Sequence, residues 1–190
     1  EAVTDKTPIL IFFFGGGFSM GSKEQARLIG KSFAKSGIIV AAPNYHLYPN
    51  AVFPDFVDDA AKAVAHAWSN FRTTAGKPRP ILLSGWSAGA YISALVAYDE
   101  RYLIAQGTPA SAIDGFIGLA GPYWGGLCAG QPCPHIFIEG TETDWPAAKF
   151  VDSDDPPMLL VQGERDNYVD IGNLVALSDA GSEAGVDVFT

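Results

Sequence analysis

Short apolar runs alternate with amphipathic stretches along this chain. Residues 8–14 (PILIFFF) and 38–42 (IIVAA) are apolar without alternation, which is typical of strands buried on both faces. Between them, residues 22–36 place apolar side chains at helical spacing and end at Gly37. Residues 55–71 predict an amphipathic helix. The first part of the chain therefore predicts strand, helix, strand and helix.

The second part of the chain repeats this alternation. Strands are predicted at residues 81–83, 113–120, 158–163 and 185–189, and helices at 91–98 and 171–184. Residues 121–151 are irregular and rich in Gly, Pro and aromatic residues, and we interpret them as an insertion over the end of the sheet. Strands alternating with helices predict an α/β fold, with a mostly parallel sheet and helices on both faces, in one domain over residues 1–190.

Composition narrows the function classes. The chain is 48% hydrophobic and 17% charged, as expected of a globular domain of 190 residues with a sizeable core. Its formal net charge of -9 argues against nucleic acid and anionic membrane surfaces as partners, because both need basic patches. No apolar run approaches the ~20 residues of a membrane span. The chain opens almost directly on a core strand, so we expect preceding segments of the fold to be missing.

The two cysteines, Cys128 and Cys133, lie five residues apart among Gly and Pro. This spacing is consistent with a local disulfide and equally with two free thiols, and it leaves the compartment open. No Cys/His spacing resembles a zinc site, so we expect no metal.

A Gly-x-Ser-x-Gly motif lies between a predicted strand and a predicted helix. In Gly85-Trp86-Ser87-Ala88-Gly89, the residues two before and two after the serine are small, as a tight strand-to-helix turn demands. Ser87 would then project above the sheet at the N-terminus of the next helix, where developing negative charge is favoured. The alternative is a Gly/Ser turn met by chance.

A second glycine cluster, Gly15-Gly16-Gly17, follows the first predicted strand. Such a run lets the backbone approach a ligand closely and leaves N–H groups free of side chains. It indicates either an oxyanion hole or a flexible turn.

Four motifs together resemble α/β-hydrolases of the carboxylesterase/lipase type, related to hormone-sensitive-lipase-like and feruloyl-esterase-like enzymes. They are Gly15-Gly16-Gly17, Asn44-Tyr45-His46-Leu47, Gly85-Trp86-Ser87-Ala88-Gly89 and the segment from Pro157 to Val169. The chain departs from the family pattern at Phe14, which replaces a histidine, and at His46, which replaces an arginine. No histidine follows Asp166, so we expect the family's catalytic histidine beyond Thr190.

The resemblance implies a role for several residues. Ser87 would be the nucleophile and Asp166 the triad acid, with Asp170 as the second choice. The oxyanion hole would be formed by Gly16, Gly17 and Ala88. An acyl or alcohol pocket would be lined by Phe18, Trp86, Tyr123 and Trp124, although each of these also fits ordinary packing. No cofactor is implied.

None of the chain's histidines, His46, His66 and His135, is predicted to be the base. The predicted function is a serine hydrolase that cleaves short-chain carboxylic esters, its small-molecule substrates, through an acyl-enzyme. A non-catalytic binding protein on a hydrolase scaffold and an amidase or formamidase remain as alternatives.

Overall fold

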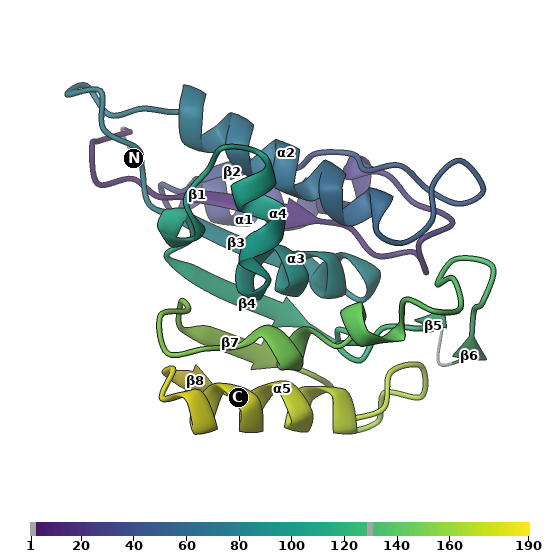
Figure 1. Cartoon of the computed structure of the whole chain (residues 1–190). Coiled ribbons are helices and arrows are strands. Elements are labelled where there is room, and N and C mark those ends of the chain that lie inside the picture. The colour runs from purple at the N-terminus through teal and green to yellow at the C-terminus, as the bar shows by residue number, and fades with distance from the viewer. Residues whose placement is uncertain (1–2, 129–130) are drawn as a thin grey trace.

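A six-stranded parallel sheet forms the centre of the computed structural model, which describes residues 3–128 and 131–190 (Figure 1). The strands lie in the order β2-β1-β3-β4-β7-β8, and each neighbouring pair is parallel. Their bounds are β1 Ile9–Phe13, β2 Ile39–Ala41, β3 Ile81–Trp86, β4 Gly115–Leu119, β7 Met158–Val161 and β8 Val188–Phe189. The predicted fold class is confirmed.

Helices cover both faces of this sheet. Their bounds are α1 Arg27–Lys35, α2 Asp55–Asn70, α3 Ala88–Tyr98, α4 Glu100–Ala105 and α5 Gly172–Ala184. In Figure 1, α1 lies behind the sheet, where it packs on β2, while α2, α3 and α4 lie in front of it. Every residue of α3 is buried, because this helix packs on β1, β3 and β4 and is itself covered by α2 and α4. Among the described helices, none has the length and apolarity needed to cross a membrane.

Helix α4 was not predicted from the sequence. It is six residues long, too short for a periodic pattern to stand out. Its N-terminus is capped by Asp99, whose side chain accepts a hydrogen bond from the N–H of Arg101. The helix expected at residues 22–36 is also shorter, because residues 23–26 form a 3-10 turn before α1 begins.

Residues 121–151 are mostly irregular, as predicted. They contain a two-stranded antiparallel ribbon, β5 (Leu127–Cys128) and β6 (Gln131–Pro132), and two 3-10 turns, Glu142–Asp144 and Ala147–Phe150. Cys128 and Cys133 form a disulfide, which decides between the two alternatives left by the sequence. The second 3-10 turn packs on α3 and α5 and ties this segment to the body of the fold.

An aromatic cluster fills the core where the residues following β1 meet α2 and α3. Phe18 stacks on Phe56 of α2 with ring centroids 4.8 Å apart, and it meets Phe137 edge-on at 5.2 Å. Tyr91 of α3 packs edge-on against both Phe18 and Phe137. Such pairs add about 0.5–1.5 kcal/mol each beyond the burial of their area. The cluster therefore anchors the backbone directly after the glycine run.

The sheet is not covered equally on its two faces. Along β7, Met158 and Leu160 are buried, whereas Leu159 and Val161 are exposed. Successive side chains of a strand point to opposite faces, and α5 covers only one of these faces of β7. The other face of β7 and β8 thus presents apolar side chains to solvent.

Candidate active site

Ser87 occupies a strained turn between β3 and α3. Its backbone has φ 53° and ψ −121°, a conformation that costs a non-glycine residue of order 1–3 kcal/mol. The turn is held by its own hydrogen bonds. The N–H of Ser87 donates to the carbonyl of Leu119 (2.8 Å), and its carbonyl accepts from the N–H groups of Ala90 and Tyr91 (2.9 and 3.1 Å). The predicted strand-to-helix turn is confirmed, and it places the serine at the N-terminus of α3.

The two motif glycines are sterically required. A Cβ on Gly85 would lie 2.3 Å from the carbonyl carbon and oxygen of Gly89. A Cβ on Gly89 would lie 2.1 Å from the carbonyl oxygen of Phe13 at the end of β1. Real Cβ atoms almost never come closer than 3.0 Å to such atoms. The elbow can therefore pack against β1 only with glycine at both positions.

The loop Gly15–Gly17 lies directly against this elbow. A Cβ on Gly15 would be 3.1 Å from the Cβ of Ser87 and 2.8 Å from the carbonyl oxygen of Trp86. Gly16 and Gly17 have φ values of 140° and 57°, which glycine adopts readily. The carbonyl of Gly16 accepts hydrogen bonds from the N–H groups of Ser19 and Met20, so the loop turns back on itself.

Three backbone N–H groups at this junction are unpaired among the described residues. Within residues 3–128 and 131–190, the amides of Gly16, Gly17 and Ala88 donate to no protein acceptor. Ala88 is the first residue of α3, whose early N–H groups have no acceptor within the helix. Unpaired donors beside a serine are what stabilisation of an oxyanion requires. Their predicted role in an oxyanion hole stays a prediction.

Ser87, the glycine loop and Asp166 line one cavity of about 470 Å³. This volume lies within the range of ~300–1,000 Å³ that is usual for small-molecule sites. The apolar part of its wall is formed by Met20, Trp86, Ala120, Tyr168 and Val169. The cavity opens at the carboxyl ends of the parallel strands, where ligands collect in open α/β sheets.

Asp166 reaches this cavity from the loop after β7. Its Oδ1 accepts hydrogen bonds from the N–H groups of Tyr168 (2.8 Å) and Val169 (3.1 Å), which fix the carboxylate. Asp170 does not line the cavity, and its Oδ1 accepts from the N–H of Gly172 at the start of α5 (2.7 Å). The structure thus brings Asp166, rather than Asp170, together with Ser87.

The four predicted pocket residues are placed differently. Trp86 lines the cavity and is 52% exposed. Phe18 and Tyr123 are buried in the core, where Tyr123 packs edge-on against Phe116. Trp124 is exposed, and its backbone N–H donates to Oδ1 of Asn173. The structure does not bring Phe18, Tyr123 or Trp124 to the cavity.

Sequence reasoning missed Met20, Tyr168 and Val169 as wall residues. Met20 comes three residues after the glycine run, and Tyr168 comes two after Asp166. Their nearness in sequence to predicted site residues was the available signal. It was weak because neither loop has a periodic pattern that shows where its side chains point.

None of the three histidines lines the cavity with Ser87. Nδ1 of His46 lies 2.6 Å from Oδ2 of Asp59 on the protein surface. His66 sits on α2 with Nδ1 3.3 Å from Nδ2 of Asn70, and His135 packs edge-on against Tyr48. That none of these histidines acts as the base stays a prediction.

Comparison with known proteins places this geometry in a family. The BD-FAE family model matches residues 1–112, more than half of the chain. The chain is 32% identical over 120 residues to "Probable isoprenylcysteine alpha-carbonyl methylesterase ICMEL2" of Arabidopsis thaliana, covering 61% of this chain and 28% of that protein. It is 27% identical over 198 residues to "Esterase LipQ" of Mycobacterium tuberculosis, covering 95% and 47%. The chain thus spans less than half the length of these two curated relatives.

Solved structures share the fold. The apo form of Thermogutta terrifontis esterase 2 superposes with a TM-score of 0.83 at 23% identity, over 98% of this chain and 71% of that one. At this identity the likeness shows the fold alone. Together with the family match, it confirms the resemblance recognised in the motifs. This chain belongs to the BD-FAE family, within the α/β-hydrolases of the carboxylesterase/lipase type.

Proposed function

We propose that this protein is a serine hydrolase that cleaves short-chain carboxylic esters through an acyl-enzyme. The observation that carries the proposal is Ser87 on a strained turn, inside a cavity that it shares with the glycine loop and Asp166. Curated relatives named as esterases and a carboxylesterase support the same reaction type.

In this proposal Oγ of Ser87 attacks the ester carbonyl carbon while a base removes its proton. The N–H groups of Gly16, Gly17 and Ala88 hold the negative oxygen of the tetrahedral intermediate. The alcohol leaves with the proton returned by the base, and water then hydrolyses the acyl-enzyme by the same steps. Each oxyanion donor contributes roughly 10²–10³ in rate.

The residues that line the cavity include no histidine. In our proposal the base is therefore a histidine that is not among these lining residues. Asp166 does not take that role in our proposal but orients an imidazole and stabilises its protonated form. As the family resemblance implies, we propose that the histidine follows Thr190 in the chain. A serine hydroxyl is a weak nucleophile at neutral pH and needs such a base.

The cavity supports a small substrate. Its volume of about 470 Å³ and its mainly apolar wall, with Met20, Trp86 and Tyr168, suit a short acyl chain and a compact alcohol. Few charged groups reach this wall, so a neutral ester is favoured over a charged one.

The test compares p-nitrophenyl acetate hydrolysis by residues 1–190 with hydrolysis by a form extended through the next histidine, each with a Ser87→Ala variant. We expect the extended form to be active. Its Ser87→Ala variant should keep at most the residual rate of order 10³–10⁴ over water, and residues 1–190 should show that same low rate with or without Ser87. Turnover by residues 1–190 that Ser87→Ala abolishes would mean that His46, His135 or another group is the base. An inactive extended form that still binds the ester would favour the binding-protein alternative, and faster cleavage of an anilide would favour an amidase.

A further inference from the structure

The motif Asn44-Tyr45-His46-Leu47 has no part in the mechanism proposed above, although it is one of the four that carry the family resemblance. In the structure it lies in the loop after β2, where Tyr45 is 4% exposed while Asn44 and His46 are exposed. None of these four residues lines the cavity that holds Ser87. The buried tyrosine therefore needs an explanation other than contact with substrate.

Tyr45 reaches the residue that directly precedes the glycine loop. Its hydroxyl donates a hydrogen bond to the carbonyl of Phe14 (2.8 Å). The two buried rings are stacked, with their centroids 4.3 Å apart and an angle of 16° between their planes. Burial raises the pKa of the Tyr45 hydroxyl above its usual value, so the group stays protonated and can donate. This contact fixes the backbone at the point where the glycine loop begins.

The carbonyl of Phe14 also lies against the elbow. A Cβ on Gly89 would be 2.4 Å from the Phe14 oxygen, so this oxygen packs directly on the start of α3. Because the peptide bond is planar, a carbonyl held in this way also fixes the direction of the N–H of Gly15. The next two residues, Gly16 and Gly17, carry two of the three predicted oxyanion donors. Glycine is conformationally permissive, so the path of this loop depends on contacts at its ends.

Two further hydrogen bonds join the loop after β2 to the segment that contains the glycine loop. Oδ1 of Asn44 accepts from the backbone N–H of Lys23 (2.8 Å). The backbone N–H of Tyr48 donates to the carbonyl of Phe18 (2.9 Å). Together with the first bond, they hold residues 14–23 at both ends and in the middle.

His46 fixes the same loop to helix α2. Its backbone N–H and its Nδ1 lie 3.0 and 2.6 Å from Oδ2 of Asp59. Asp59 belongs to a helix with six buried residues, and its own side chain is only 16% exposed. The loop after β2 is thus attached to a well-packed helix on one side and to the glycine loop on the other.

We propose that residues 44–48 form a brace that positions the oxyanion donors, with Tyr45 as its principal positioning residue. This inference rests on the proposed function, because it assigns the amides of Gly16 and Gly17 to the oxyanion. Tyr45 touches no substrate but acts through the carbonyl of Phe14. Oxyanion donors must lie about 2.7–3.1 Å from the negative oxygen, so a small displacement of the loop weakens them.

The test measures p-nitrophenyl acetate hydrolysis by the form extended through the next histidine. Tyr45→Phe keeps the stacked ring and removes only the hydroxyl. We expect kcat to fall about tenfold or more while KM stays within twofold, because the donors serve the oxyanion of the transition state rather than the bound ester. The inhibition constant of a trifluoromethyl ketone should rise by about the same factor. Oγ of Ser87 adds to the carbonyl carbon of this ketone and gives its proton to the base, which leaves a negative oxygen facing the same donors.

Tyr91→Phe is the matched control. Tyr91 is also buried, and its hydroxyl also donates to a backbone carbonyl, that of Trp145 (3.0 Å). Neither Tyr91 nor Trp145 lines the cavity with Ser87. The two Tyr→Phe variants should lower Tm by similar amounts, but Tyr91→Phe should leave kcat within twofold.

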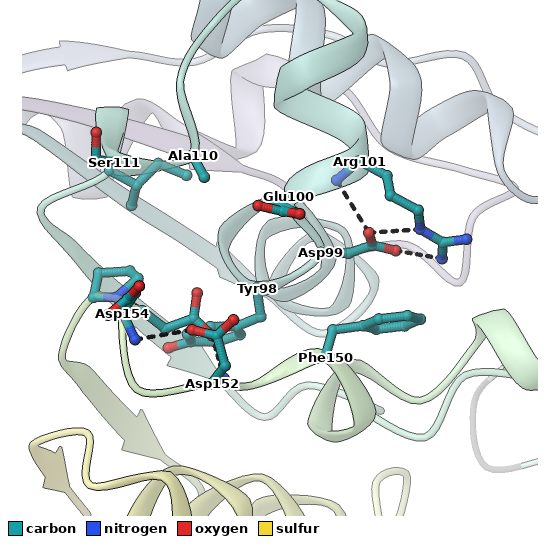
Figure 2. Close-up of a pocket in the computed structure, with 12 residues that line it drawn as sticks. Tyr98, Asp99, Glu100, Arg101, Ala110, Ser111, Phe150, Asp152 and Asp154 are labelled. Atoms are coloured by element: carbon teal, nitrogen blue, oxygen red, sulfur yellow. Dashed lines mark hydrogen bonds and ion pairs between the residues drawn. The ribbon is translucent and has the colours of Figure 1, made fainter.

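A second control lies at the amino ends of β4 and β7. A cavity of about 660 Å³ opens there, and it shares none of its described wall residues with the cavity around Ser87 (Figure 2). Burial, followed by repulsion from neighbouring carboxylates, raises the pKa of Asp155 in its wall to about 7, so Tm values are compared at pH 8, where this group is largely ionised. Figure 2 shows the guanidinium of Arg101 bonded to both carboxylate oxygens of Asp99 (2.8 and 2.7 Å). Arg101→Met leaves that buried carboxylate without these bonds, so Tm should fall while kcat stays within twofold.

Asn44 offers a test by rescue. Asn44→Ala removes the acceptor of the Lys23 N–H and should lower kcat about threefold or more. Asn44→Asp keeps an oxygen at this position and should hold kcat within twofold of the parent protein.

Amide NMR spectra of the same extended form give a readout that needs no activity. The N–H signals of Gly16 and Gly17 should shift in Tyr45→Phe and stay in place in Tyr91→Phe. Unshifted signals, an unchanged kcat in Tyr45→Phe, or an equal loss of kcat in both Tyr→Phe variants would overturn the proposal. If the parent form does not hydrolyse the ester and the signals still shift, the proposed function fails, whereas the positioning of the glycine loop by Tyr45 is supported.

Discussion

Gly89→Ala probes the contact between the elbow and the central strand. The added Cβ would lie 2.1 Å from the carbonyl oxygen of Phe13 and 2.4 Å from that of Phe14. Both neighbours are backbone atoms, so no side-chain rotation can relieve the clash. To reach an ordinary contact, α3 must move about 1 Å away from β1 within a close-packed interior.

The expected cost follows from two opposing effects. Overpacking of this kind costs roughly 1–3 kcal/mol or more, and rigid backbone neighbours put it at the upper end. Replacing glycine by alanine inside a helix stabilises the helix by about 1 kcal/mol. We therefore expect a net loss of about 2 kcal/mol or more in the free energy of unfolding. For a domain of this size that corresponds to a fall in Tm of about 4–8 °C.

Gly30→Ala in α1 is the matched control. Its Cβ would lie 3.5 Å from Cγ1 of Val40, an ordinary contact, so the helical gain of about 1 kcal/mol should appear without a clash. Urea and thermal unfolding of the two variants and the parent protein measure both effects. If Gly89→Ala is as stable as the parent, or gains stability together with Gly30→Ala, the steric reasoning about the elbow is refuted.

Three further changes test other parts of the structure. Asp166→Asn in the ester-hydrolysing form should lower kcat by about 10²–10⁴. KM and Tm should change little, because the amide oxygen of asparagine still accepts hydrogen bonds from the two backbone N–H groups. An unchanged kcat would show that Asp166 is not part of the site. Replacing Cys128 and Cys133 by alanine should lower the free energy of unfolding, measured in urea, by about 2 kcal/mol, because the disulfide closes a small loop and so reduces the entropy of the unfolded chain. Equal stabilities of the variant and the parent protein would contradict this. The raised pKa of Asp155 means that the folded state holds a proton more tightly than the unfolded state, so its contribution to stability should fall as pH rises from about 4 to about 7. Asp155→Asn should flatten that part of a Tm–pH profile, and an unaltered profile would show that Asp155 titrates normally.

The sequence was sufficient for the features that depend on local sterics and on runs of apolar residues. Residues 8–14 read as a buried strand, and β1 lies there as the second strand from its edge of the sheet. The spacing of Gly85 and Gly89 around Ser87 predicted the strained turn, because only small residues fit where a strand reverses into a helix. Both inferences need only a few neighbouring residues.

Other features were decided by long-range packing. Phe18 and Trp86 are both aromatic and both adjoin predicted site loops, yet Phe18 enters the core and Trp86 lines the cavity. Leu159 belongs to an unbroken apolar run, yet it is exposed because α5 covers only the other face of β7. The sequence pattern is the same for a covered and an uncovered face.

The sequence by itself determined the alternation of strands and helices, the elbow at Ser87 and the pairing of a glycine loop with it. Only the tertiary structure decided which side chains share a cavity. Ser87 and Asp166 line one cavity, and Tyr98 and Asp155 line another, because the strand order β3-β4-β7 brings segments more than fifty residues apart to the same ends of the sheet. Periodicity records which face of an element is buried, but the neighbours across that face depend on strand order and loop packing, which no local pattern contains.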